Sequence, residues 1–398
     1  MKIILLSHMF TNGNLGVGAL SIANLLIISE ACESIGIKPK FYLFGYKAKK
    51  VDYSFELQSH NIDYEIVTIS YKKYILNFFK IYKIFKSSDV VFDIGQGDSF
   101  ADIYGNKRFI SIIIPEFFSL FTKTPLVLAP QTIGPFKSKF AKISAKYILT
   151  KSKVVFARDH KSYLAAEELM QQDKNQISSL KETVDVAMLL PYQKNKDNQN
   201  NKILVGLNVS ALLFHGGYTQ NNQFSLMVNY RELMAMIIEY FKSLDNVELV
   251  LVAHVLEYEK DHIENDFEVC SILGKKYGIK VAPFFKSPIE AKSYISQFDF
   301  FMGARMHATI AAFSSGVAVT PMAYSRKFEG LYNSLDYNYL VDMTKKNTNE
   351  SFELVVNHYN KRDELQEAVI NGKQKAIEKL DHYKQTVKDI LHECKSSS

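Results

Sequence analysis

Short apolar runs alternate with longer amphipathic stretches along the whole sequence, and this alternation restricts the fold class more than any other feature. Apolar runs of this length are typical of strands, and the stretches between them have helical spacing. In the first half, strands are predicted at residues 3–7, 40–45, 63–69, 89–94, 125–129, 153–157 and 184–188. Helices are predicted between them, for example at residues 18–35, 136–150 and 159–171. Strands that alternate with helices in this way are typical of a parallel sheet.

A uniformly polar stretch at residues 193–202 interrupts the alternation and is predicted to be a linker. After it, strands are predicted at 203–208, 247–253, 279–282, 299–302 and 317–323, and a charged helical tail at 361–393. A chain of 398 residues is too long for one ordinary core. We therefore predict an α/β protein with two Rossmann-like domains, residues 1–192 and 203–360, whose parallel sheets face a cleft. The long C-terminal helix, residues 361–398, could brace the first domain.

The composition excludes several classes of protein. The net charge of +6 is too small and too dispersed to indicate nucleic-acid binding, although it suits anionic substrates or a membrane surface. Cys32, Cys270 and Cys394 are far apart, so neither a disulfide framework nor a zinc site is expected. Residues 1–7 are predicted to be a strand rather than a targeting segment. These features favour a cytoplasmic protein.

The strongest candidate for chemistry is the run Gly303-Ala304-Arg305-Met306-His307-Ala308. An apolar strand ends at Gly303 and a helix begins near Arg305, so backbone N–H groups and a guanidinium are available to an anion. The next strand ends in Tyr324-Ser325-Arg326-Lys327, and parallel pairing would add Lys327 to the same anion site. Alternatively, His307 is an ordinary helix cap or a packed side chain.

Further candidates follow other predicted strands. Three glycine-bearing turns, at residues 12–18, 93–98 and 130–135, could let the backbone approach a ligand, or could simply be tight turns. Arg158 ends one strand and either binds an anion or pairs with Asp159. The substrate-binding candidates at these positions and at the ends of the second-half strands are Asn14, Gly16, Gly97, Asp98, Gln131, Gly134, Asn208, His254 and Tyr324.

The Gly303–Ala308 run, followed by Tyr324-Ser325-Arg326-Lys327, resembles the C-terminal signature of the polysaccharide pyruvyl transferases. The resemblance covers roughly residues 1 to 340 and is fairly specific only at this signature. Four weaker elements occur in the family's order: Asn14-Leu15-Gly16, Gly95-Gln96-Gly97 with Asp102, Gln131-Thr132-Ile133-Gly134-Pro135 and Ala157-Arg158-Asp159. The chain departs from the family pattern at Val17-Gly18, at Gln96 and at Asn208.

The resemblance implies a fold of the GT-B type, phosphoenolpyruvate as donor, and a saccharide or lipid-linked oligosaccharide as acceptor. It implies no metal and no cofactor. It also implies that Arg158, Arg305, His307 and Lys327 line the donor site. His307 is then the general acid–base candidate, because ketal formation needs a group that titrates near neutrality.

Two other functions remain open at this stage. A GT-B glycosyltransferase would use the same fold and the same basic residues to bind the diphosphate of a nucleotide sugar. A family member that has lost catalysis could serve as a binding protein in polysaccharide assembly, and the departure at Val17-Gly18 is compatible with this. The oligomeric state cannot be read from the sequence.

Residues 71–86 form a basic amphipathic pattern. Lys72, Lys73, Lys80, Lys83 and Lys86 fall on one side of a helix, and aromatic and apolar residues fall on the other. We favour packing of the aromatic side on the first sheet. The exposed lysines could still hold the enzyme at the inner face of the membrane by contact with anionic headgroups.

Overall fold

The computed structural model describes residues 1–45, 51–68, 76–171, 179–194, 202–257, 259 and 262–396. The chain forms two compact units, and neither is continuous in sequence. The first comprises Met1–Thr11, Leu20–Val186 and Ala376–Ser398, and the second comprises Asn12–Ala19 and Ala187–Lys375. Most of the predicted linker, residues 195–201, lies outside the described residues.

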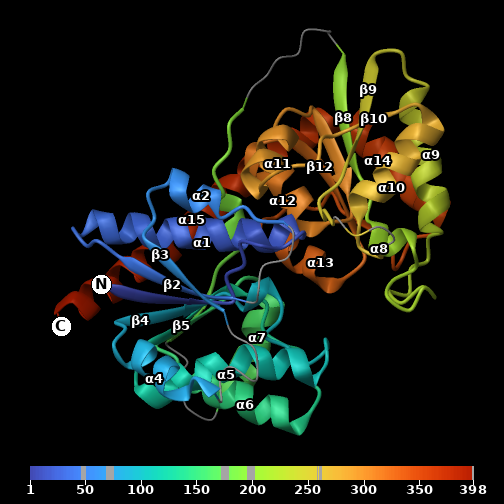
Figure 1. Ribbon diagram of the computed structural model, residues 1–398. Helices are drawn as coiled ribbons and strands as arrows, with labels where there is room; N and C mark the ends of the chain where they lie inside the picture. The colour runs from blue at the N-terminus through green and yellow to red at the C-terminus, as the bar shows by residue number, and fades with distance from the viewer. Residues whose placement is uncertain are drawn as a thin grey trace. The chain divides into compact units, whose positions relative to one another are not determined.

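The first unit contains a seven-stranded parallel sheet in the order β3-β2-β1-β4-β5-β6-β7 (Figure 1). The strands are β1 (Lys2–Leu6), β2 (Lys40–Gly45), β3 (Tyr64–Thr68), β4 (Val90–Asp93), β5 (Leu126–Gln131), β6 (Val154–Ala157) and β7 (Leu180–Glu182). Six of the seven predicted strands are confirmed to within a few residues.

The strand predicted at 184–188 is wrong. The last strand of the sheet is β7, and residues Val186–Leu189 form a 3-10 helix. Val184 and Val186 are buried, which explains the apolar signal. The chain leaves the sheet after Thr183, whose N–H still donates to Ala157 O, and this places Asp185 beside Arg158.

The two faces of this sheet are covered by different helices. The helices on one face are α4 (Phe78–Lys86), α5 (Asn106–Thr122), α6 (Lys139–Lys151) and α7 (His160–Met170). Side chains alternate across a strand, so Val155 joins the core beneath these helices whereas Phe156 faces the other side. There its ring centroid lies 4.8 Å from that of Tyr383 in the C-terminal helix.

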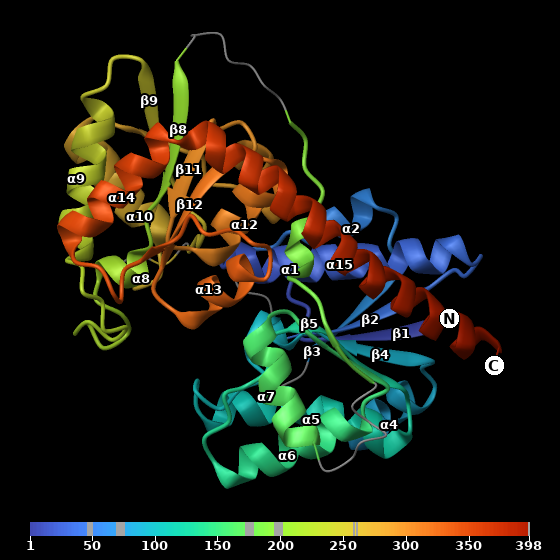
Figure 2. The same cartoon turned by 180° about the vertical axis from the view of Figure 1, so that it is seen from behind.

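The C-terminal helix α15 (Arg362–Ser396) belongs to the first unit from Ala376 onward and docks there (Figure 2). The Tyr383 hydroxyl donates to Asn24 Oδ1 at 2.5 Å, and Asn24 Nδ2 donates to His8 Nε2 at 3.0 Å. His8 Nδ1 donates in turn to Leu6 O at 2.8 Å. Burial lowers the pKa of His8 to about 4, which keeps the ring neutral and able to accept this bond. The predicted bracing of the first domain by the tail is confirmed.

Asn24 belongs to α1 (Leu15–Ser34), and a short helix α2 (Phe55–Ser59) follows β2. By length and composition alone α1 could cross a membrane, but 89% of its most apolar window is buried inside the protein, as in a core helix.

The second unit contains a six-stranded parallel sheet in the order β10-β9-β8-β11-β12-β13. Its strands are β8 (Ile203–Asn208), β9 (Val247–Val252), β10 (Lys280–Val281), β11 (Phe300–Gly303), β12 (Ala318–Ala323) and β13 (Val341–Asp342). Its helices are α8 (Ala211–Phe214), α9 (Tyr230–Lys242), α10 (Asp266–Tyr277), α11 (Pro288–Ile295), α12 (Met306–Ser315), α13 (Arg326–Asn333) and α14 (Thr348–Asn360). The five predicted strands are confirmed. The two-residue strand β13 was not predicted, because so short a run gives no periodic signal.

Two carboxyl groups, Asp93 at the end of β4 and Glu116 in α5, are fully buried in the first unit. Burial raises the pKa of both, and the nearby charge of Asp93 raises that of Glu116 well above its ordinary value. The folded protein therefore retains a proton at a pH where the unfolded chain has released it. Stability must fall as the pH rises above the ordinary glutamate pKa of 4.5.

We predict that Glu116→Gln is more stable than the wild type at pH 8, by on the order of 1–3 kcal/mol, because a neutral amide replaces a buried acid. The difference should vanish at low pH, where Glu116 is protonated in both states. Thermal melts between pH 4 and pH 8 check this. Glu168→Gln, at an exposed position of α7, is the control and should change little. Equal stability of Glu116→Gln and the wild type at pH 8 would contradict the assignment.

Candidate functional site

The carboxyl ends of four neighbouring strands in the second sheet carry four of the predicted site residues. Asn208 ends β8, His254 follows β9, Arg305 follows β11 and Tyr324 follows β12. In the sheet these strands lie in the order β9-β8-β11-β12. The structure therefore gathers these four residues at one sheet edge, where parallel α/β sheets bind their ligands.

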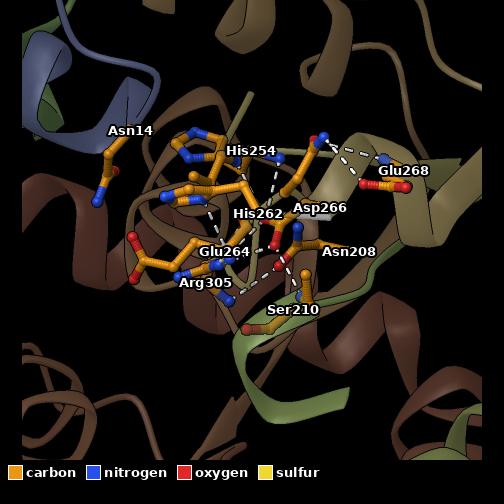
Figure 3. A network of polar contacts seen from close by, with 12 residues as sticks. Asn14, Asn208, Ser210, His254, His262, Glu264, Asp266, Glu268 and Arg305 are labelled. Atoms are coloured by element: carbon orange, nitrogen blue, oxygen red, sulfur yellow. Dashed lines mark hydrogen bonds and ion pairs between the residues drawn. The ribbon is translucent and has the colours of Figure 1, made fainter. Parts of the chain in front are cut away.

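Asp266, at the start of α10, holds this edge together (Figure 3). Its carboxylate accepts hydrogen bonds from Arg305 Nε at 3.0 Å and Arg305 Nη2 at 2.8 Å. It also accepts from the backbone N–H groups of Ala211 at 2.8 Å and Val255 at 3.0 Å. One buried carboxylate thus ties together the loops that follow β8, β9 and β11.

Arg305 is charged in this setting. Burial lowers the pKa of its guanidinium, but the charge and hydrogen bonds of Asp266 together outweigh this and leave the pKa above its ordinary value. Nη2 also donates to Glu264 O at 3.2 Å. The direction of the Arg305 guanidinium is therefore fixed, and Asp266 balances much of its charge.

Asn208 is fully buried and cross-links three strands. Its Oδ1 accepts from Arg305 N at 2.8 Å, and its Nδ2 donates to Val252 O at 2.9 Å. A Cβ atom at Gly303 would lie 2.5 Å from Asn208 Cβ, so only glycine fits between β11 and this side chain. Asn208 supports the site, and direct contact between Asn208 and substrate stays a prediction.

The N-terminal glycine turn belongs to the second unit, where it packs on this same edge. Leu15 N donates to His254 O at 3.2 Å, and Asn14 forms an antiparallel bridge with Val255. A Cβ atom at Gly16 would lie 2.3 Å from His307 Nδ1. The structure therefore brings Asn14 and Gly16 to His254 and His307, although almost three hundred residues separate the turn from His307.

Two helices begin at this edge. His307 lies in the first turn of α12, and Lys327 lies in the first turn of α13, next to Tyr324 and Arg326. Their parent strands β11 and β12 are paired. Burial, together with the nearby His307 and Arg305, lowers the pKa of His254 to about 3, so His254 is neutral at physiological pH.

The remaining candidates lie in the first unit. Arg158 is buried and donates from Nη1 to Asp185 Oδ2 at 2.6 Å and from Nε to Thr132 Oγ1 at 2.9 Å. A Cβ atom at Gly97 would lie 3.1 Å from Arg158 Nη1. Arg158 thus pairs with Asp185, while Asp159 caps α7 by accepting from Ser162 N at 2.8 Å.

Three more candidates surround this cluster. Gln131 Nε2 donates to Asp93 O at 3.1 Å, and Gly134 N donates to Phe100 O at 2.9 Å. Asp98 accepts from the Tyr104 hydroxyl at 2.8 Å. The roles of these residues, and of Arg158, in binding substrate stay predictions.

Sequence reasoning missed Asp266 and Asp185. Neither follows a recognisable motif, and both act through partners distant in sequence, 39 residues away for Asp266 and 27 for Asp185. Among the described residues, no group of three or more His, Cys, Asp or Glu side chains is placed to hold a metal ion.

A family model for polysaccharide pyruvyl transferases matches residues 43–326. The chain belongs to the polysaccharide pyruvyl transferase family. The matched range contains Arg158, Arg305 and His307, whereas Asn14, Gly16 and Lys327 lie outside it. No curated protein matches the chain significantly.

Solved structures show that this pyruvyl transferase family member has the fold of GT-B glycosyltransferases and related epimerases. UDP-GlcNAc 2-epimerase from Neisseria meningitidis, solved with UDP-GlcNAc, has 10% identity and a TM-score of 0.59 over 100% of both chains. Sucrose-phosphate synthase from Thermosynechococcus elongatus has 9% identity and a TM-score of 0.58, again over 100% of both chains.

Removing the carboxylate of Asp266 should destabilise the second unit. Asp266→Asn leaves the Arg305 guanidinium buried without its counter-charge, which we expect to cost about 3–5 kcal/mol. Urea unfolding measures this. Glu248→Gln breaks the surface pair with Lys280 in the same unit and should cost under about 1 kcal/mol. Equal losses in the two variants would show that the Asp266–Arg305 pair does not organise the edge.

Proposed function

We propose that this protein transfers the pyruvyl group of phosphoenolpyruvate to two hydroxyl groups of a saccharide, forming a ketal and releasing phosphate. Family membership supports this reaction class. The observation that carries the proposal is the presence of Arg305, His307 and Lys327 where two adjacent strands pass into their helices at one sheet edge. The acceptor is a surface polysaccharide or its lipid-linked precursor, and the reaction takes place on the cytoplasmic side of the membrane.

The donor phosphate binds at the helix starts. The first turns of α12 and α13 present backbone N–H groups, which favour an anion. Lys327 contributes a point charge in the first turn of α13, and Arg305 contributes an oriented fork. The Asp266–Arg305 pair sets the direction of the guanidinium, and Lys327 adds a second positive charge for the leaving phosphate.

The reaction requires two proton transfers. One acceptor hydroxyl loses its proton as its oxygen adds to C2 of phosphoenolpyruvate, and one proton reaches the methylene carbon, which becomes the methyl group. The second hydroxyl then attacks C2, and the C2–O bond to phosphate breaks. The proton of this second hydroxyl leaves with the phosphate. Atoms and charge balance without an oxidant, a reductant or a further co-reactant.

His307 is the side chain that we assign to these transfers. Its neighbour His254 stays neutral at physiological pH and cannot donate a proton as an imidazolium. His307 is the second residue of α12 and comes directly after Arg305 and Met306. It lies against the glycine turn at Gly16. The absence of a side chain at Gly16 leaves room for the imidazole against the glycine turn.

Replacement of Lys327 should weaken donor binding. We expect Lys327→Gln to raise the Kd for phosphoenolpyruvate by roughly 10–100-fold, because a charge-assisted contact is lost. Isothermal titration with phosphoenolpyruvate measures the change. Lys361→Gln, in an exposed pair with Glu364 of the same unit, is the matched control. Unchanged affinity for phosphoenolpyruvate in Lys327→Gln would remove this residue from the donor site. Tight binding of UDP-GlcNAc in place of phosphoenolpyruvate would favour the glycosyltransferase alternative.

Replacement of His307 should affect turnover rather than donor binding. We expect His307→Gln to lower turnover by roughly 10²–10⁴, with little change in the Kd for phosphoenolpyruvate. Phosphate release in the presence of polysaccharide from the producing cell follows turnover. His60→Gln, at an exposed histidine of the first unit, is the control. Normal turnover of His307→Gln would make His307 a structural residue of the α12 start.

A further inference from the structure

The helices α4, α5 and α6 lie side by side on one face of the first sheet (Figures 1 and 2). They carry several exposed apolar side chains. Phe79 is 81% exposed. The exposed apolar residues of these helices are Phe78, Phe79, Phe121, Phe140, Ile143 and Tyr147, and we call them the outer apolar patch. Single exposed apolar residues are ordinary, but a group on three adjacent helices indicates a binding surface.

Helix α6 has two apolar faces. Ala141, Ala145 and Ile148 pack into the core of the first unit. A second stripe, Phe140, Ile143 and Tyr147, recurs at helical spacing, and its members are 51%, 59% and 48% exposed. An amphipathic helix needs only the first face to dock on its sheet, so the second stripe has a different use.

Ring contacts join the three helices. The rings of Phe78 in α4 and Phe118 in α5 lie 5.4 Å apart between centroids, and those of Phe117 in α5 and Tyr147 in α6 are stacked at 5.8 Å. The ring of Phe121 in α5 lies 6.0 Å from that of Tyr82 in α4. The patch residues Phe78, Phe121 and Tyr147 therefore each pack on a ring of the neighbouring helix.

The charged side chains of α4, α5 and α6 are almost all positive. The three helices contain eight lysines, one arginine and a single carboxyl residue, Glu116, which is buried. The rest of the chain then holds 39 basic and 41 acidic residues, so the entire positive excess of the protein lies on these helices. In α6 each residue of the apolar stripe directly follows a lysine: Lys139, Lys142 and Lys146.

We propose that this surface docks on an anionic lipid membrane, with the outer apolar patch in the headgroup boundary and the lysines on lipid phosphates. Aromatic side chains in a field of lysines are the pattern of interfacial membrane elements. Protein–protein interfaces are enriched in arginine and depleted of lysine, and this surface has the opposite composition. The patch belongs to the first unit and is separate from the residues assigned to catalysis, so the proposal does not depend on the proposed reaction.

This surface differs from the one expected from the sequence. Lys72 and Lys73 of the predicted basic helix lie outside the described residues, whereas Lys80, Lys83 and Lys86 lie in α4. Ile81 and Phe85 are buried in the core, as we favoured for the aromatic side, but Phe78 and Phe79 are exposed. The proposed membrane surface extends over α5 and α6, which the sequence pattern did not indicate.

Vesicle sedimentation of the full chain tests the role of charge. The protein should pellet with vesicles of phosphatidylcholine and phosphatidylglycerol at low salt, be released by high salt, and not pellet with phosphatidylcholine alone. The combined change Lys139→Gln, Lys142→Gln and Lys146→Gln should lower the partition coefficient by on the order of 10-fold or more. The control, Lys275→Gln with Lys276→Gln and Lys280→Gln, removes the same charge from the second unit and should change the partition coefficient less than twofold. Absence of pelleting, or an equal loss in both triple variants, would overturn the proposal.

A fluorescence measurement tests insertion of the patch independently of charge. The sequence contains no tryptophan, so Phe79→Trp introduces a single indole reporter. With anionic vesicles its emission should shift to the blue and be quenched by brominated acyl chains. The same reporter at Phe214, made by Phe214→Trp in the second unit, should show neither effect. Unchanged emission of Phe79→Trp on vesicles that do pellet the protein would overturn docking through this patch. Circular dichroism melts confirm that each variant is folded.

Discussion

The buried ion pair between Asp266 and Arg305 is the interaction on which the second unit's carboxyl edge depends. A carboxylate removed from water is costly unless its oxygens are paired. Asp266 meets this requirement with the guanidinium of Arg305 and with backbone N–H groups from the loops after β8 and β9. Those loops cannot move apart without leaving a buried charge unpaired. The start of α12, and with it His307, is therefore placed by electrostatics as well as by packing.

Close packing at this edge also explains two of its glycines, Gly303 and Gly16. Arg305 N must reach Asn208 Oδ1, which brings β11 so close to β8 that Gly303 has no room for a Cβ atom. The N-terminal turn presses against His307, which excludes a side chain at Gly16. Val17 and Gly18, where the chain departs from the family pattern, come directly after Gly16 in the sequence. An acidic helper is absent from these two positions, so the proposed proton transfers rest on His307.

The local sequence pattern predicts the strands and the residues at their ends. Parallel strands place Arg305, His254 and Asn208 at strand ends, and those ends meet at one edge once the strand order is that of a GT-B fold. Asp266 could not be predicted, because it lies at a helix start like many other acids and gains its role only through Arg305 and the loops. The strand predicted at 184–188 failed for a related reason, since Asp185 leaves the sheet to reach Arg158. The second stripe of α6 was missed because periodicity identifies an apolar face but does not tell whether that face is buried.

Mass spectrometry of the surface polysaccharide tests the central claim most directly. Polysaccharide from the producing cell would be compared with that from a cell lacking this protein, and from one carrying His307→Gln. The account predicts that a pyruvyl ketal is present in the first and lost in the other two, with the sugar composition unchanged. A polysaccharide that lacks a sugar residue when the protein is absent, with pyruvyl substitution unaffected, would contradict pyruvyl transfer and indicate a glycosyltransferase.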